Sequence, residues 1–319
     1  MILRLIFITL VIEPTVISGW KNKLNPARNG MDRPEYVLNA LSRSESLYYF
    51  GLGSNMLRSK IENRSSNGKI HVISMEPAMV PGHRLAFNMR GFLPLEPGMG
   101  SLEPLGKAKT SRPLLAYTKP ECHGALILLD PENYEKVMQS EGVSHNSTMG
   151  GYEEIVVDAY PYGSSIPVKA VALRAKPHVR LKRDPAPSLR YITLLRQGAA
   201  ELGLEAEYQE FLAQHPVQNV PGWLRRMAVN NLVFTFVVSS KLKTRIYGKF
   251  QSWLLFGLYD PSVQEGPRKA IADGVSAVIL LPGCLFGYVI RRYFEKNEKM
   301  TPPFLGMMMK MFDDKEEQS

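Results

Sequence analysis

The chain has 319 residues, a formal net charge of +9 and two cysteines, Cys122 and Cys284. That length exceeds one typical domain, and 45% hydrophobic with 22% charged residues is the composition of a folded globular chain. Two cysteines in separate regions exclude a framework of disulfides, so a reducing environment is tolerated.

The N-terminus opens with an apolar run, residues 1–12, which ends at Glu13. The run has the size of a secretory h-region rather than of a membrane-spanning helix. A signal peptide, a signal anchor and a targeting leader all fit residues 1–20. Residues 21–45 are polar and contain two prolines, which predicts a linker.

The most informative segment is residues 49–56, with the sequence Y-F-G-L-G-S-N-M. A strand-like stretch, residues 47–50, leads into it, and residues 56–61 have the pattern of a helix. Glycines let the backbone approach a ligand closely, and the amides of a helix N-terminus attract an anion. The turn therefore suits a carboxylate, a phosphate or a developing oxyanion. The alternative is a structural corner that binds nothing.

A second segment places an acid after a short helix. Residues 123–129 are strand-like, and residues 130–138 follow as a helix with Asp130 as N-cap and Pro131 in the first turn. Glu141 comes next, beside a glycine, and such a side chain can be aimed into a cleft. The alternative is a solvated acid in a turn.

A third segment, residues 187–208, carries P-S-L-R-Y, then G-A, G-L and a final tyrosine. Together the segments resemble the γ-glutamylcyclotransferase family. That family has a Y-G-S-N loop after its first strand, an H/W-G strand before a helix, an E-G pair with the catalytic glutamate, and a late P-S-x-x-Y…G-A…G-L…Y helix. All four occur in order over residues 46–214.

The resemblance implies a reaction in which the α-amino group of a γ-glutamyl compound attacks its own γ-carbonyl. An amine leaves and 5-oxoproline remains, a step of glutathione and γ-glutamyl metabolism catalysed by enzymes of the lyase or acyltransferase type. Glu141 corresponds to the catalytic residue, which accepts a proton from the amine and protonates the departing nitrogen. Because the attack is intramolecular, holding a folded substrate conformer supplies much of the acceleration.

The resemblance also implies a substrate pocket around the glycine-rich loop, whose amides would hold the carboxylate or the oxyanion. Two positions depart from the family: Leu52 replaces an aromatic residue, and residues 168–173 lack a tyrosine. Asn55 argues against the glutathione-specific relatives, which carry G-S-L. The predicted substrate-binding residues are Leu52, Gly53, Ser54, Asn55, Met56 and Tyr152. A tyrosine that merely packs on a strand is the alternative for Tyr152.

We expect no cofactor and no metal. The six histidines are scattered without a pair at ligand spacing, and the two cysteines form no cluster. The glycine-rich loop lacks the Lys-Ser/Thr ending of a nucleotide-binding P-loop. The expected partner is a small γ-glutamyl substrate, and nothing in the sequence indicates an oligomeric state.

The strand-like and helical runs indicate an α+β class. Residues 188–202 predict a late helix with a second one reaching residue 214, while the glycine- and proline-rich residues 91–120 predict a surface loop that could cover the cleft. The resemblance adds a small closed barrel of mixed strands with helices packed outside. Its cleft would lie between the G-S-N loop and Glu141.

The C-terminal part is basic and apolar. Residues 274–290 form a run of 17 residues without charge, at the short end for a membrane span. Residues 221–299 hold 12 Lys/Arg against 5 Asp/Glu, which favours an anionic membrane surface. No nucleic-acid signature accompanies this charge, so nucleic acid is not expected as a partner. The alternative is a helical cap packed on the domain. Residues 231–238 and 253–259 are too short to span, and suit interfacial helices or core packing.

These observations predict five regions: a leader (1–20), a linker (21–45), a γ-glutamylcyclotransferase-like domain (46–215), a basic apolar extension (216–300) and an acidic-ended tail (301–319). A glycan on the sequon at Asn146 would obstruct the cleft beside Glu141. We therefore expect a catalytic domain that faces the cytosol, either membrane-associated through residues 274–290 or cytoplasmic.

Three functions fit the sequence. The preferred one is a γ-glutamylcyclotransferase for γ-glutamyl amino acids or peptides. A cyclotransferase for γ-glutamyl amines and a non-catalytic, membrane-associated binding protein on the same fold are the alternatives. A binding protein has no need of a carboxylate base at Glu141.

Overall fold

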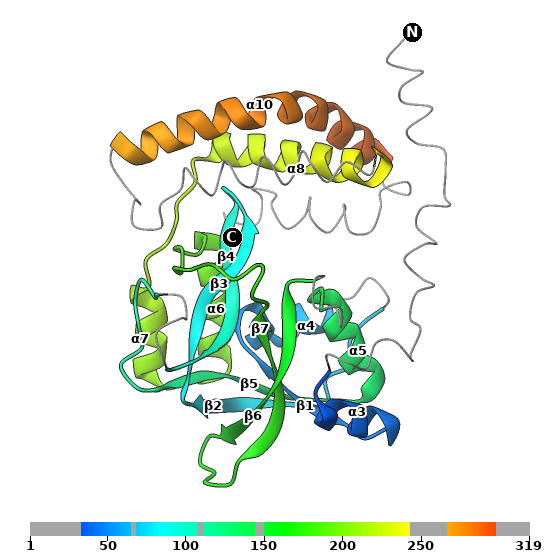
Figure 1. The fold of residues 1–319 in the computed structure, drawn as a ribbon, viewed down its shortest axis with the longest axis vertical. Coiled ribbons are helices and arrows are strands. Elements are labelled where there is room, and N and C mark those ends of the chain that lie inside the picture. Colours follow the sequence, from blue (N-terminus) through cyan, green and yellow to red (C-terminus); the bar gives the residue numbers. More distant parts are fainter. Residues whose placement is uncertain (1–32, 65–67, 107–111, 144–149, 243–266, 298–319) are drawn as a thin grey trace.

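The computed structural model describes residues 33–64, 68–106, 112–143, 150–242 and 267–297. Its centre is a closed barrel in the order β1-β5-β2-β6-β7, which confirms the predicted α+β class with a small mixed-strand barrel (Figure 1). β1 pairs antiparallel with β5, and a parallel bridge between Tyr49 and Val171 closes the barrel. The strands are β1 (Leu47–Gly51), β2 (Ser74–Pro81), β5 (Glu121–Leu129), β6 (Tyr152–Pro161) and β7 (Val168–Ala175).

Two further strands form a hairpin beside the barrel, β3 (His83–Phe92) and β4 (Glu96–Pro104). The prediction of a surface loop over residues 91–120 is therefore wrong for β4, which is largely buried. Glycine and proline lower strand propensity, but here close packing requires glycine. A Cβ on Gly98 would lie 2.2 Å from the carbonyl oxygen of Phe87 on β3.

The three predicted helices around the barrel are present, namely α5 (Pro131–Ser140), α6 (Leu189–Glu201) and α7 (Ala206–Gln214). Asp130 caps α5 by accepting a hydrogen bond from the Asn133 amide at 2.8 Å. Ser188 caps α6 in the same way through the Tyr191 amide at 3.1 Å. Both caps satisfy amides that lack a partner within the helix, which explains where the helices begin.

A helix absent from the sequence prediction, α3 (Glu35–Ser42), lies in the segment predicted as a linker. Val37 and Ala40 are buried on its inner face. Just before it, the Arg33 guanidinium donates to both carboxylate oxygens of Glu154 on β6, at 2.9 and 3.0 Å. The Tyr134 hydroxyl of α5 donates to the same carboxylate at 2.6 Å. The chain is therefore part of the folded domain from Arg33 onward.

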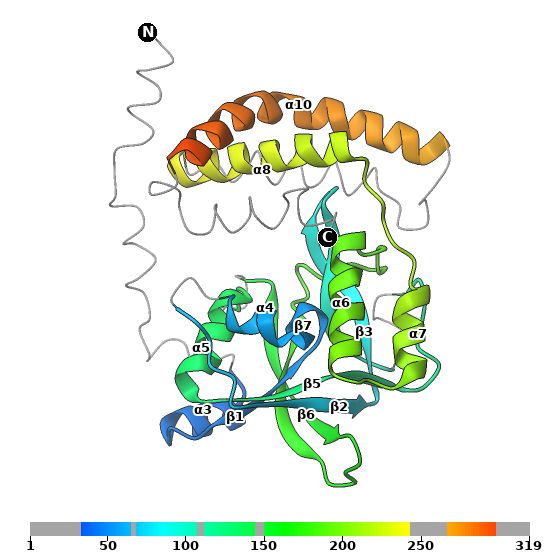
Figure 2. The same ribbon diagram turned by 180° about the vertical axis from the view of Figure 1, so that it is seen from behind.

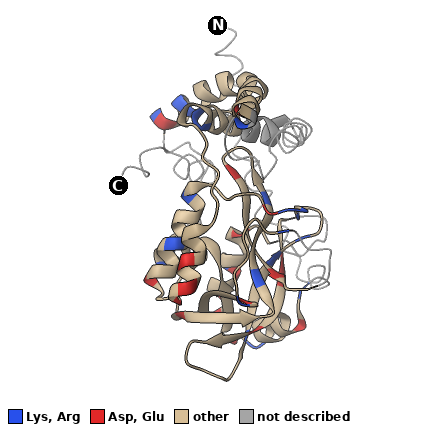
Figure 3. Cartoon of the chain, turned by 90° about the vertical axis from the view of Figure 1, so that its left-hand side faces the viewer, with Lys and Arg blue, Asp and Glu red and all other residues tan. Residues whose placement is uncertain are grey.

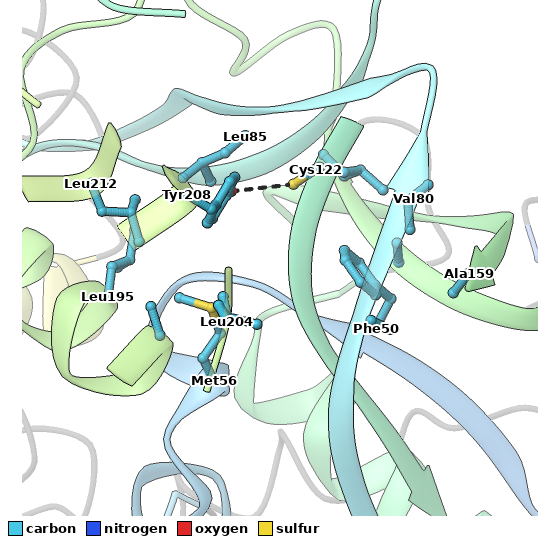
Figure 4. Close-up of a cluster of buried hydrophobic side chains, with 14 of the residues drawn as sticks. Phe50, Met56, Val80, Leu85, Cys122, Ala159, Leu195, Leu204, Tyr208 and Leu212 are labelled. Atoms are coloured by element: carbon cyan, nitrogen blue, oxygen red, sulfur yellow. Dashed lines mark hydrogen bonds between the residues drawn. The ribbon is translucent and has the colours of Figure 1, made fainter. Parts of the chain in front are cut away.

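Alternate residues of the barrel strands supply two hydrophobic clusters. Phe50 and Leu126 belong to the cluster that includes residues of α6 and α7, part of which Figure 4 shows. Tyr49 and Ile127, one position along each strand, belong to the cluster that includes residues of α3 and α5. Helices on both sides thus fix the position of β1, whose last residue leads into the glycine-rich loop.

Two long helices, α8 (Gly222–Leu242) and α10 (Pro267–Lys296), form a helix pair across the end of the β3–β4 hairpin (Figures 1 and 2). Leu95 of the hairpin packs in one cluster with Leu224 and Leu280 of the pair. α10 has 30 residues and contains the whole predicted charge-free run. Ion pairs four residues apart, Lys269 with Asp273 and Arg291 with Glu295, extend the helix beyond that run.

The remaining predictions for the C-terminal part are divided between described and undescribed residues. Residues 231–238 lie within α8. Residues 1–20, 253–259 and 301–319 and the sequon at Asn146 lie outside the described residues.

Candidate active site

The glycine-rich loop and Glu141 meet although 86 positions separate Asn55 from Glu141 in the chain. Glu141 is the C-cap of α5, and the left-handed Gly142 (φ +68°) turns the chain away from the helix there. The Asn55 side-chain amide donates to Glu141 Oε1 at 2.6 Å. Two of the motifs that define the resemblance therefore share a direct hydrogen bond.

Two further side chains complete a polar network around that bond. Asn55 Nδ2 also lies 2.8 Å from the hydroxyl of Tyr49, which is buried on β1. Arg64, just after the short helix α4 (Arg58–Glu62), donates from Nη1 to Glu141 Oε1 and to Asn55 Oδ1. The exposed fraction of the side chain is 11% for Glu141 and 24% for Arg64, so both are shielded and both can still be reached from solvent.

A second group of contacts joins the loop to the β3–β4 hairpin through Gly100 of β4. The Gly100 amide donates to the Tyr191 hydroxyl at 2.9 Å, and the Tyr152 hydroxyl donates to the Gly100 carbonyl at 2.8 Å. Gly53 has φ +72°, and a Cβ there would lie 2.4 Å from the Tyr191 hydroxyl oxygen. Only glycine combines that backbone conformation with so close a neighbour.

Three buried tyrosines experience the charge of Glu141. Burial, and to a lesser degree that negative charge, raises the pKa of Tyr49 and Tyr152 well above the ordinary value of 10. Burial likewise raises the pKa of Tyr191, with the charges of Glu96 and Glu141 adding to it. The three phenols therefore stay neutral at physiological pH and act as hydrogen-bonding groups rather than as bases.

The predicted substrate-binding residues occupy different environments. Leu52 and Ser54 are half-buried, whereas Tyr152 is buried and bonded to β4. Met56 is 2% exposed and belongs to the hydrophobic cluster beneath α6. Their roles in binding a substrate stay predictions.

The expected helix over residues 56–61 is wrong in its bounds. The loop instead forms a single 3₁₀ turn, η2 (Gly53–Met56), and the five-residue α4 follows it. Helices this short have few aligned peptide dipoles, so their ends attract an anion weakly. The main positive charge at this site comes from the Arg64 side chain instead.

Sequence reasoning missed Arg64 as a site residue. It is one of 39 Lys and Arg residues, and its side chain reaches Glu141 only through the fold. Tyr191 is different, since it stands in the P-S-L-R-Y motif that carried the resemblance. Its position in that motif was a signal that could have identified it.

Among the described residues, one group has the ligand types of a metal site. Glu121 and His123 on β5 and Glu205 before α7 offer donor atoms within 4.8 Å of one another. Lys119 Nζ already lies 2.9 Å from Glu205 and balances its charge. Burial lowers the pKa of His123, so the ring is neutral and bonds to Glu121 and to the Tyr162 hydroxyl.

Comparison with known proteins gives the following. No protein-family model matches the chain. The chain is 29% identical over 198 residues to the gamma-glutamyl cyclotransferase gliK of Claviceps purpurea, covering 59% of this chain and 83% of that relative. It is 27% identical over 186 residues to gliK of Aspergillus fumigatus, covering 55% and 64%, and 27% identical over 157 residues to the gamma-glutamyl cyclotransferase verK of Clonostachys rogersoniana, covering 46% and 82%. A solved gamma-glutamyl cyclotransferase aligns with 21% identity and a TM-score of 0.43, covering 55% of this chain and 91% of that one.

Proposed function

Because the chain belongs to the γ-glutamylcyclotransferase family, we propose that it converts a γ-glutamyl amino acid or peptide to 5-oxoproline and the free amino acid or peptide. The observation that carries the proposal is the 2.6 Å hydrogen bond from Asn55 of the glycine-rich loop to Glu141. It joins the loop to a carboxylate that is only 11% exposed. A binding site alone would not need a shielded acid at this point.

In the proposed mechanism Glu141 first accepts a proton and later donates it. The α-amino nitrogen of the substrate forms a bond to its own γ-carbonyl carbon and loses a proton to Glu141. When the bond from that carbon to the leaving nitrogen breaks, Glu141 returns the proton to that nitrogen. No bond to the protein forms, and the loop residues Gly53 and Ser54 would hold the developing oxyanion.

The cysteine of the barrel domain fits a mechanism without a covalent intermediate. Cys122 is buried, and burial raises the pKa of its thiol to about 12. Its sulfur lies 3.7 Å from the Tyr208 hydroxyl within the hydrophobic cluster (Figure 4). This thiol therefore stays protonated and inert at neutral pH.

The test is release of 5-oxoproline by the full chain from a panel of γ-glutamyl amino acids, γ-glutamyl peptides and γ-glutamyl amines. Glu141→Gln keeps the side-chain size but cannot accept the proton, and we expect it to lower kcat about 100- to 10,000-fold. Glu132→Gln is the matched control, because Glu132 lies on the same helix with 79% of its side chain exposed. Turnover of the amines alone would favour the γ-glutamylamine alternative. Absence of turnover from the folded chain would contradict the enzyme and favour a binding protein.

We further propose that the helix pair attaches the protein to a membrane, with the catalytic domain on the cytosolic side. α10 is long and apolar enough to cross a bilayer, and among the described helices it alone meets that test. Its outward residues are apolar: Val278 is 71% exposed, Leu285 63% and Phe286 60%. Its inward residues include Ser276 and Asp273, which are buried. Apolar groups outside and polar or small groups between helices are typical of packing in lipid.

Sedimentation of the full chain with lipid vesicles tests the attachment. We expect binding to vesicles that contain phosphatidylserine and weaker binding to pure phosphatidylcholine, since Arg291 and Arg292 flank the apolar face. Val278→Glu with Leu285→Glu should abolish binding, whereas Ile166→Glu, at an apolar residue 74% exposed on the barrel domain, should not. Equal sedimentation of both variants with vesicles would contradict attachment through α10.

A further inference from the structure

We propose that Arg64 selects substrates that carry an α-carboxylate, and that substrate binding transfers its guanidinium from Glu141 to that carboxylate. This inference deepens the proposed function and rests on it. It is carried by one geometric observation, namely that the same oxygen of Glu141 accepts hydrogen bonds from both Arg64 and Asn55.

The proposed base is therefore already engaged before any substrate arrives. Glu141 Oε1 accepts from Asn55 Nδ2 at 2.6 Å and from Arg64 Nη1, and Arg64 also donates to Asn55 Oδ1. Departure of one of these donors gives Oε1 a lone pair for the proton of the amine, in addition to those of Oε2. Asn55 is the more firmly held of the two donors because it is 4% exposed and bonded to Tyr49.

Arg64 is the donor that can move. Its side chain is 24% exposed and extends from the chain just beyond the five-residue α4. A shielded guanidinium that leaves one carboxylate needs another anion in its place. A γ-glutamyl group supplies one in its α-carboxylate, which a guanidinium can bind with two parallel hydrogen bonds.

The other groups around Glu141 do not offer this exchange. Tyr49, Tyr152 and Tyr191 are neutral phenols at physiological pH. Among the described residues, Arg64 is the cation that contacts Glu141. The substrate would thus satisfy Arg64 and remove one donor from Glu141 Oε1 in a single event.

Two ligands that differ only in the carboxylate test the selection. 5-Oxoproline carries it and 2-pyrrolidinone does not. We expect the full chain to bind 5-oxoproline about 10- to 100-fold more tightly, as for a charge-assisted hydrogen-bonded pair, and Arg64→Gln to reduce that ratio to near one. Arg64→Lys should keep part of it. Arg43→Gln, which removes an arginine 68% exposed, should keep all of it. An unchanged ratio in Arg64→Gln, or no binding of 5-oxoproline by the folded chain, would overturn the proposal.

Turnover separates this proposal from the enzyme assignment. γ-Glutamyl-alanine and 4-aminobutanoyl-alanine also differ only in the α-carboxylate, and the second cyclises to 2-pyrrolidinone. Arg64→Gln should lose activity toward the first substrate while its activity toward the second is kept or increased. Equal losses toward both would overturn the role of Arg64 and leave the enzyme intact. Selective binding of 5-oxoproline without turnover would keep the role of Arg64 and contradict the enzyme.

Discussion

The barrel domain and the helix pair expose different kinds of side chain. In the barrel domain, buried charges are matched by buried or shielded partners, as for Arg84 with Asp184. Charged residues of both signs are distributed along its helices and strands (Figure 3). In the helix pair, by contrast, Val278 and Leu285 of α10 point outward, whereas Asn231 is buried between the helices. This difference fits the proposed attachment of the helix pair to a membrane.

The contrast shows what sets the cost of a buried polar group. A charge that the barrel domain buries loses its hydration and needs an ionic partner. The polar residues between α8 and α10 are mostly uncharged, and the pair approaches closely where small residues stand. A region that places apolar groups outside gains little from a hydrophobic interior of its own, so close packing and hydrogen bonds hold its helices together.

The largest effect on stability is expected from removing one partner of a buried ion pair in the barrel domain. Asp184 accepts hydrogen bonds from Arg84 and from the Phe87 amide, at 2.8 and 3.1 Å. Asp184→Ala should lower the free energy of unfolding by about 3–5 kcal/mol, measured by urea titration. The control Asp158→Ala removes an acid 58% exposed and should change it by less than about 1 kcal/mol. Equal effects would mean that burial does not set the strength of these pairs.

A smaller effect is expected from disturbing the helix pair. A Cβ on Gly287 would lie 1.7 Å from the Asn230 carbonyl oxygen, whereas around Gly274 on the same helix there is open space. Gly287→Leu should weaken the packing by about 1–3 kcal/mol. Hydrogen exchange of α8 and α10 should then become faster while that of the barrel strands stays the same. Gly274→Leu should not accelerate hydrogen exchange in either region, since Leu favours a helix more than Gly does. Faster exchange in the barrel strands of Gly287→Leu would show that the two regions are one cooperative unit.

The smallest effect concerns pH and should be confined to the barrel domain. Burial lowers the pKa of His123 below its ordinary value of 6.5, although Glu121 and Glu205 oppose this and Lys119 adds to it. The unfolded chain then binds this proton more readily than the folded one. The contribution of neutral His123 to the free energy of unfolding is complete above pH 6.5. It is lost as the pH falls toward the pKa of His123 in the folded chain.

Unfolding temperatures between pH 7.5 and 5.5 measure this effect. As the pH falls, the unfolding temperature of His123→Gln should decline less steeply than that of the unsubstituted chain. Some pH dependence should persist in this variant because burial lowers the pKa of His215 too. Hydrogen exchange of α8 and α10, which contain no histidine, should not follow this titration. Identical pH dependence with and without His123 would contradict the assignment.

What the sequence could predict depends on how local each signal is. β1, β5 and α5 were predictable because short apolar or aromatic runs and an Asp-Pro cap each stand within a few residues. β4 was not, because the glycines that weaken its propensity are required by contacts with β3. α3 was not, because a helix of only eight residues is marginal alone and depends on packing against distant elements.

The same distinction applies to the candidate site. Asn55 and Glu141 stand in sequence motifs, and the resemblance to a family predicted that both line one cleft. Arg64 has no motif around it, and its place beside Glu141 follows only from the path of the chain after α4. The sequence therefore indicated Glu141 as the proposed base but not Arg64 as the cation that pairs with it.

The ion pair between Arg33 and Glu154 determines where this chain can be cut. A fragment that starts at residue 46, where the family motifs begin, would lose Arg33 and leave the Glu154 carboxylate, 1% exposed, without its guanidinium. Loss of one partner from such a pair costs about 3–5 kcal/mol, a large part of the stability of a domain this size. An excised barrel domain should therefore begin before Arg33. A shorter fragment that proved inactive would report on its own unfolding rather than on the chemistry of Glu141.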